Sequence, residues 1–221
     1  MVLESERPGS KYNNTNEITK FPWTCDFGAV EGTPDWCGII QDGKGDDTYK
    51  WDVQQGDTPT SGTGPPRAGE GQGNYAFTEA TGFNPGSTAS FISPFIPNEK
   101  RPKCLSFLQA TTGNHEATIK ILNQHGTVLA TRVGVMGTPD WFQANITLSS
   151  DVRHFVVESY RRGSSPEEDQ GDAVVDDMRL DVGRCPNEGW LDGGGGGTVT
   201  GSGTGGIIFF TLFINIHKFF Y

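Results

Sequence analysis

Apolar and polar residues alternate in short runs along most of this chain. Such alternation predicts strands that bury one face. Glycine, proline and asparagine separate the runs, and no stretch of ten or more residues shows a helical period between capping residues. The sequence therefore predicts about nine or ten short strands and no helix. The expected strands lie within residues 21–27, 49–53, 75–78, 89–95, 104–110, 117–122, 128–133, 141–148, 155–160 and 173–180.

Many short strands that each have one apolar face must bury those faces against another sheet. We therefore expect an all-β fold, a jelly-roll β-sandwich of two antiparallel sheets. The pattern also divides the chain. Residues 1–20 are polar and aperiodic and predict a disordered arm, 21–187 form the domain, 188–206 are a glycine-rich linker, and 207–221 form a short hydrophobic tail.

Composition narrows the partners. The chain has 221 residues, 31 glycines, 13 prolines and a formal net charge of −10. Nucleic acids and anionic membrane surfaces attract proteins through lysine and arginine patches, so this acidity argues against both as partners.

A long loop at 56–74 has no apolar period. Loops of that length are usually functional, and we expect a binding edge there.

The four cysteines, Cys25, Cys37, Cys104 and Cys185, lie wide apart. Zinc sites use closely spaced thiolates and histidines, which this spacing does not offer. Two disulfides in an oxidising compartment are favoured over buried free thiols. The simplest pairing ties Cys25 to Cys37 and an interior strand to the last one. Four cysteines allow three pairings, however, and sequence alone does not choose among them.

Two triplets fit the acceptor pattern for N-linked glycans, at Asn13 and Asn145. Asn145 sits beside a turn, so we expect it at the surface. Both triplets and the disulfides favour an extracellular or cell-surface location. The first residues lack the apolar core of a signal peptide, so secretion calls for an N-terminal part that this sequence does not include; a cytosolic protein with free thiols is the alternative.

Seven pieces of this sequence stand in the order in which they occur in one extracellular module, and over about 21–186 the chain resembles a MAM domain. This is the module of meprins, neuropilins and some receptor tyrosine phosphatases. Cys104-Leu105-Ser106-Phe107, for example, matches the family's Cys-Leu-x-Phe. The matching pieces are Cys25 to Phe27, Asp46 to Trp51, Thr58 to Pro65, Gly73 to Glu79, Ala89 to Pro94, Cys104 to Phe107 and Asp172 to Met178.

The resemblance implies a jelly-roll sandwich with the disulfides Cys25–Cys37 and Cys104–Cys185. It implies adhesion, contacts between copies and oligomerisation at the cell surface, without catalysis. Some family members hold a cation near the first cysteine and the closing acids. The family's glutamate at that point is Gly28 here, which argues against a complete site.

The candidate cofactor is a Ca²⁺ or Na⁺ ion, since hard cations take carboxylate and carbonyl oxygens. The candidate ligands are Asp26, Asp47, Glu79 and Asp177. Asp176 and Asp177 are neighbours in an expected strand and so point to opposite faces; Asp177 is the one we expect at the site. The alternative is that these acids cap turns or face solvent.

No catalytic motif is present: G-x-S-x-G, H-E-x-x-H and the phosphate-binding loop are all missing from the sequence. We therefore expect no enzyme. Four tryptophans fall on apolar faces and are expected in the core rather than in sugar-binding platforms. They are Trp23, Trp36, Trp51 and Trp141.

The hydrophobic tail at 207–221 is shorter than the roughly 20 residues that span a bilayer. Three interpretations of this tail are open: a non-native C-terminus, a GPI-attachment signal and a truncated membrane segment. The tail is the one expected route to a membrane.

The first function hypothesis is a non-catalytic extracellular adhesion module. The others are a cation-dependent carbohydrate-binding module and an accessory domain of a secreted metalloprotease.

Overall fold

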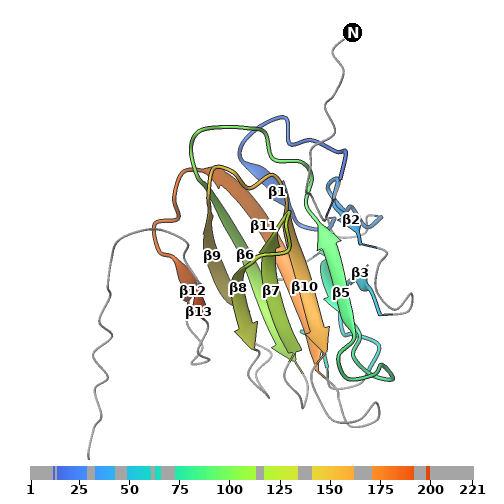
Figure 1. The fold of residues 1–221 in the computed structure, drawn as a ribbon. Helices are drawn as coiled ribbons and strands as arrows, with labels where there is room; N and C mark the ends of the chain where they lie inside the picture. The colour runs from blue at the N-terminus through green and yellow to red at the C-terminus, as the bar shows by residue number, and fades with distance from the viewer. Residues whose placement is uncertain are drawn as a thin grey trace, which may run out of the picture.

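Two antiparallel β-sheets pack face to face in the computed structural model (Figure 1), and no helix occurs among the residues it describes. The expected all-β sandwich is therefore confirmed. No membrane-spanning helix is found in this part of the chain. The structure describes residue 12 and residues 14–28, 33–42, 49–60, 63–65, 73–112, 117–133, 141–161, 171–191 and 198–199.

The first sheet has seven strands in the order β12-β9-β6-β11-β4-β3, with β1 paired to β11 beside β4. Its centre is β11, which pairs with β6 along most of its length and with β4 or β1 on its other side. The strands are β1 (Trp23–Cys25), β3 (Trp51–Gln54), β4 (Tyr75–Thr78), β6 (Lys103–Thr112), β9 (Phe142–Leu148), β11 (Asp172–Val182) and β12 (Gly189–Leu191).

The second sheet has six strands in the order β13-β8-β7-β10-β5-β2. From β4 to β11 the chain passes repeatedly from one sheet to the other, so each sheet is built from strands far apart in sequence. This crossing is the arrangement of a jelly roll. The strands are β2 (Ile40–Gln41), β5 (Thr88–Ile92), β7 (Ala117–Asn123), β8 (Val128–Val133), β10 (Phe155–Arg161) and β13 (Thr198–Val199).

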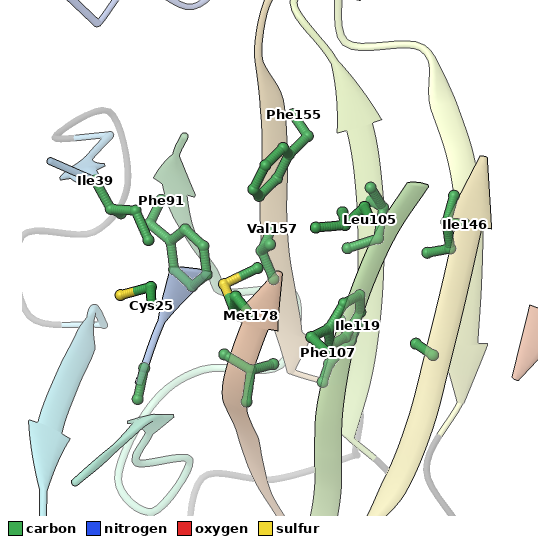
Figure 2. Packing of buried hydrophobic residues seen from close by; sticks show 14 of the residues in the cluster. Cys25, Ile39, Phe91, Leu105, Phe107, Ile119, Ile146, Phe155, Val157 and Met178 are labelled. Atoms are coloured by element: carbon green, nitrogen blue, oxygen red, sulfur yellow. The ribbon is translucent and has the colours of Figure 1, made fainter. Parts of the chain in front are cut away.

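Alternate side chains from both sheets meet in one core (Figure 2). Leu105, Phe107 and Ile146 come from the first sheet, and Ile119 and Val157 come from the second. Each large apolar side chain buried in this way contributes about 1.5–3 kcal/mol. The alternation seen in the sequence therefore predicted the strands to which these five residues belong and the faces that they bury.

The tryptophans take different places in the packing. Trp51 is fully buried, its ring 5.1 Å from that of Phe91 and its indole N–H donating to the Ala89 carbonyl. Trp23 and Trp36 are half-buried against the core. Trp141 packs instead against a second cluster on the outer face of the first sheet, which contains Tyr75, Phe77, Ala110 and Val174. All four tryptophans were expected in the core, and Trp51 is the one of the four that is fully buried there.

Two disulfide bonds cross-link the sandwich. Cys25 is bonded to Cys37 and Cys104 to Cys185, with Cα–Cα distances of 5.6 and 4.8 Å. The first closes the loop after β1. The second ties β6 to the segment that follows β11, and it spans 81 residues of sequence. Of the three pairings, the structure contains the one that the resemblance implied.

The described part of the N-terminal arm is ordered, which differs from the expected disorder over 1–20. Ile18 is 3% exposed and belongs to the core. Glu17 forms a parallel bridge with Phe95, and the Ile18 N–H donates to the Phe95 carbonyl at 2.9 Å. The Asn14 amide is buried and donates to the carbonyls of Gly38, Ile92 and Ser93. The fold therefore begins before residue 21.

The expected linker also contains structure. Gly189–Leu191 pairs with β9 as β12, and Thr198–Val199 pairs with β8 as β13. Both strands add to the ends of the sheets on the side where β8 and β9 lie. The hydrophobic tail at 207–221 lies outside the described residues.

Candidate functional site

The corner where β1 ends and β11 bends contains two of the acids expected at a cation site. Cys25 pairs with Met178 in an antiparallel ladder, so the next residues, Asp26 and Asp177, lie beside each other. A register shift between Asp176 and Arg179 forms a bulge, and Asp177 there has a φ of 49°. The bulge breaks the strict alternation that was expected for Asp176 and Asp177.

Two carboxylates at this corner, those of Asp26 and Asp176, accept local hydrogen bonds from the backbone. The Asp26 carboxylate accepts from the Gly28 N–H at 3.0 Å, and the Asp177 N–H donates to the Asp176 carboxylate at 2.8 Å. Asp47 lies outside the described residues. The corner therefore brings together Asp26 and Asp177 of the expected set, and the cation remains a prediction.

Glu79 lies at the opposite end of β4. Because Thr78 pairs with Ala173, Glu79 sits near Asp172 rather than near Asp177. Its carboxylate accepts from the Thr60 hydroxyl at 2.8 Å and from the Thr81 N–H at 3.1 Å. Within the described ranges no three His, Cys, Asp or Glu side chains gather as a metal cluster. The structure thus separates Glu79 from Asp26 and Asp177.

The loop after β3 is folded on itself in the part that the structure describes. The Thr58 and Thr63 hydroxyls are 2.7 Å apart, and the Thr63 hydroxyl donates to the Thr60 carbonyl. Gly64 has a φ of 76°, and a Cβ there would lie 2.5 Å from the Thr58 side chain. Only glycine fits that backbone conformation and that close approach. Thr60 also bonds to Glu79 after β4, so this part of the loop packs against its own sheet, and the binding edge expected within 56–74 stays a prediction.

Asp172 is the buried acid beneath this loop, and the sequence did not single it out. It is fully buried, and its carboxylate accepts from the Ala80 N–H at 3.1 Å. Burial raises its pKa to about 6, and the charge of Glu79 adds to the rise, while the Thr58 and Thr63 hydroxyls oppose it. The sequence signal that could have found it is an acid at the first position of a strand whose next three residues, Ala173 to Val175, are all apolar.

A row of five apolar side chains crosses the outer face of the second sheet. Ile40 pairs with Ile92, Ile92 with Val156, Val156 with Leu122, and Leu122 with Val128. We call these five residues the apolar row. Tyr12 of the arm is buried against the middle three of them. At the two ends, Ile40 is 36% and Val128 is 39% exposed, and they are the exposed large hydrophobic residues of the described chain.

A bulge brings Val128 into this row. Leu122 pairs with Val128 and Ile121 with Ala130, so Leu129 is the additional residue. Leu129 and Ala130 both pack toward the core, which turns Val128 outward. Strict alternation would have placed Val128 on the same face as Ala130, so sequence reasoning missed the row.

Beside the apolar row runs a polar one. Glu158 pairs with Ser90 and Lys120, and Lys120 with Thr131. The Lys120 ammonium lies 2.8 Å from the Glu158 carboxylate and 4.8 Å from the centre of the Tyr160 ring. The one acid and one base of these four residues balance, so this strip has no net charge although the chain carries −10.

The structure describes one of the two expected glycan acceptors. Asn13 lies outside the described residues. Asn145 is 6% exposed and lies in β9 between β6 and β12, so the expected surface position is wrong. Its side-chain oxygen accepts from Gln143, and the hydroxyl of Thr147, the third residue of the triplet, accepts from the Cys185 N–H at 3.0 Å. A glycan on Asn145 would have to displace its neighbours.

The family assignment agrees with this geometry. The sequence matches the family described as "MAM domain, meprin/A5/mu" over residues 25–186, which begins at the first cysteine and ends just after the last. The chain belongs to the MAM family. The MAM domain therefore includes both disulfide bonds, while Ile18 and Asn14 of the arm lie before the matched region.

Curated relatives are much longer than this chain. It is 30% identical to neuropilin-1a of Danio rerio over 173 residues, which cover 74% of this chain and 18% of the relative. It is also 30% identical to the MAM domain-containing glycosylphosphatidylinositol anchor protein 1 of Gallus gallus over 165 residues, covering 69% and 17%. The chain thus spans less than a fifth of these proteins.

Among solved structures, the K1 cleaved adhesin domain of Lys-gingipain from Porphyromonas gingivalis is similar in fold. The TM-score is 0.52 at 12% identity, covering 73% of this chain and 98% of that domain. At such identity the likeness concerns the sandwich alone. It agrees with the two-sheet architecture of the MAM domain.

Proposed function

We propose that this MAM domain is a non-catalytic extracellular module that mediates adhesion at the cell surface through contact with a second copy of itself. Its relatives include neuropilins and a glycosylphosphatidylinositol anchor protein that contains MAM domains, and two disulfides suit an oxidising compartment. The observation that carries the proposal is the apolar row, whose two ends, Ile40 and Val128, are exposed on either side of a middle that Tyr12 covers.

The row suits a two-fold contact. Its centre is Val156 and its ends are Ile40 and Val128, so reversing one copy places each exposed end over the opposite end of the other. Isologous contacts of this kind are the commonest in soluble homo-oligomers. The neutral strip of Glu158 and Lys120 lies alongside and spares the two acidic molecules a local repulsion.

The test measures self-association by sedimentation velocity over a wide concentration range. Ile40→Lys and Val128→Lys each place a charge in the contact, and we expect each to weaken association by about tenfold or more, equivalent to about 1.4 kcal/mol. Gln55→Lys adds the same charge to an exposed residue after β3, on the other sheet, and should leave association unchanged.

Beads coated with the MAM domain should aggregate and should lose aggregation with the same two variants. A protein that stays monomeric at every concentration would refute the self-contact. So would association that is unaffected by both lysine substitutions in variants with an unchanged melting temperature. Association lost equally in Gln55→Lys would show a general charge effect and not the apolar row.

A further inference from the structure

A pocket of about 220 Å³ lies between the N-terminal arm and the start of β1. Arm residues 16–20 form one wall, and residues 22–24 form another. Cys37, Gly38 and Pro94 complete the lining. The pocket thus joins the continuous stretch 16–24 to Cys37, Gly38 and Pro94, and it exists only because the arm is ordered against the domain.

The walls of this pocket are fixed by hydrogen bonds. The Asn16 amide donates to the Gly38 carbonyl at 2.9 Å, and the Trp23 indole N–H donates to the Cys37 carbonyl at 3.4 Å. Cys37 is itself held by its bond to Cys25, and burial of Ile18 holds the arm. Ligand sites are usually preformed in this way, with walls that do not have to be ordered on binding.

The lining combines an aromatic ring with polar side chains. Trp23 is half-buried, and its one polar atom is already paired with Cys37, so it offers carbon surface to a ligand. Asn16, Glu17 and Thr24 are exposed polar residues, and Lys20 adds an ammonium group. Glu17 and Lys20 carry opposite charges, so the lining has no net charge.

These features favour a neutral, polyhydroxylated ring over an ion. A sugar ring has an apolar face for the indole and hydroxyl groups for amide, carboxylate, hydroxyl and ammonium partners. Typical pockets for drug-sized ligands have volumes of about 300–1,000 Å³, and this one is smaller. We infer that the pocket binds one monosaccharide unit of a glycan, with the ring against Trp23.

The pocket also has a property that distinguishes it from a cation-dependent lectin site. Glu17 is the one carboxylate in its lining, whereas Ca²⁺ takes six to eight oxygen ligands and usually several carboxylates. Binding is therefore independent of divalent cations. The lining shares no residue with the apolar row, so the two sites are tested with different variants.

The test is an NMR titration of the whole chain with methyl glycosides of glucose, galactose, mannose, N-acetylglucosamine and fucose. The Trp23 indole N–H signal is assigned by its loss in Trp23→Phe. We expect at least one glycoside to shift this signal and the amides of residues 16–20 in a saturable way, with a Kd of about 1 mM. EDTA should not change the titration.

Matched variants separate the pocket from general effects. Glu17→Ala and Lys20→Ala should each weaken binding by about fivefold or more, since each removes a polar partner. The exposed controls Glu188→Ala and Lys50→Ala lie away from the pocket and should bind like the parent. Absence of a saturable Trp23 shift with every glycoside would overturn the inference, and so would binding that neither pocket variant weakens.

Discussion

The carboxyl group of Asp172 joins the loop at 58–64 to the strand at the centre of the first sheet. Its pKa is raised from 3.8 to about 6, first of all by burial. A raised carboxyl pKa means that the folded protein prefers the protonated acid. The stability that this preference contributes is fully present below pH 4 and is lost as the pH rises to about 6 and above.

Asp172→Asn should remove this pH dependence. The Asn side-chain oxygen can still accept from the Ala80 N–H, but the side chain does not titrate. Between about pH 4 and pH 7 we expect the parent to lose up to about 3 kcal/mol of unfolding free energy relative to the variant. Urea unfolding at several pH values measures this difference, with the exposed Glu188→Gln as control. Parallel pH profiles for parent and Asp172→Asn would contradict it.

Gln109 is a second buried polar residue, with a different consequence. It is fully buried on the same face of β6 as Phe107, and neither amide atom has a hydrogen-bond partner among the described residues. A buried amide without partners costs about 1–3 kcal/mol. Gln109→Met keeps a similar shape and should raise the unfolding free energy by about 1–2 kcal/mol.

Chemical denaturation measures this gain. Gln55→Met, at an exposed position after β3, is the matched control and should change stability by less than about 0.5 kcal/mol. A loss of stability in Gln109→Met would mean that the amide is stabilised by its surroundings after all.

At the scale of elements, the arm behaves as part of the fold. Removing residues 1–20 takes away the buried Ile18 and the Asn14 amide with its three backbone acceptors. We expect a loss of about 3–5 kcal/mol from the apolar burial and the hydrogen bonds together. Removing residues 1–11 keeps both side chains and should cost little. Thermal unfolding of the two truncated proteins separates these outcomes, and equal melting temperatures would refute the role of the arm.

The bounds of some strands could be predicted from sequence to the residue. The expected 75–78 and 128–133 coincide with β4 and β8, because glycine and asparagine in the preceding turns mark where each strand begins. Where a bulge breaks the period, as at Asp177 and Leu129, side-chain faces were wrong although the strands were right.

The arm and the pocket could not be predicted for another reason. Ile18 is a single apolar residue in a polar segment, and Asn14 bonds to carbonyls 24 to 79 residues away. No local pattern signals such partners. Of the expected cation ligands, Asp26 and Asp177 meet because β1 pairs with β11, whereas Glu79 lies near the far end of β11, a separation that depends on strand order and not on spacing.

At the scale of the whole molecule, the two disulfides should differ in their contribution to stability. They close segments of 12 and 81 residues. If the effect is entropic, loss of Cys104–Cys185 costs about 4–5 kcal/mol and loss of Cys25–Cys37 about 3 kcal/mol. Paired Cys→Ala variants measured by denaturant unfolding should show this order. The reverse order would mean that native-state interactions around the short loop outweigh chain entropy.

The positions of these disulfide bonds also determine how the MAM domain responds to a pulling force. A force applied before Cys25 and after Cys185 passes through sulfur at both bonds, so the segments that they close are not stretched. Only the chain between Cys37 and Cys104, which contains β2 to β5, can be drawn out. The strands β7 to β10 remain inside a covalent loop under any tension that leaves the disulfides intact. An unfolded domain would therefore act as a short tether with a fixed maximum length.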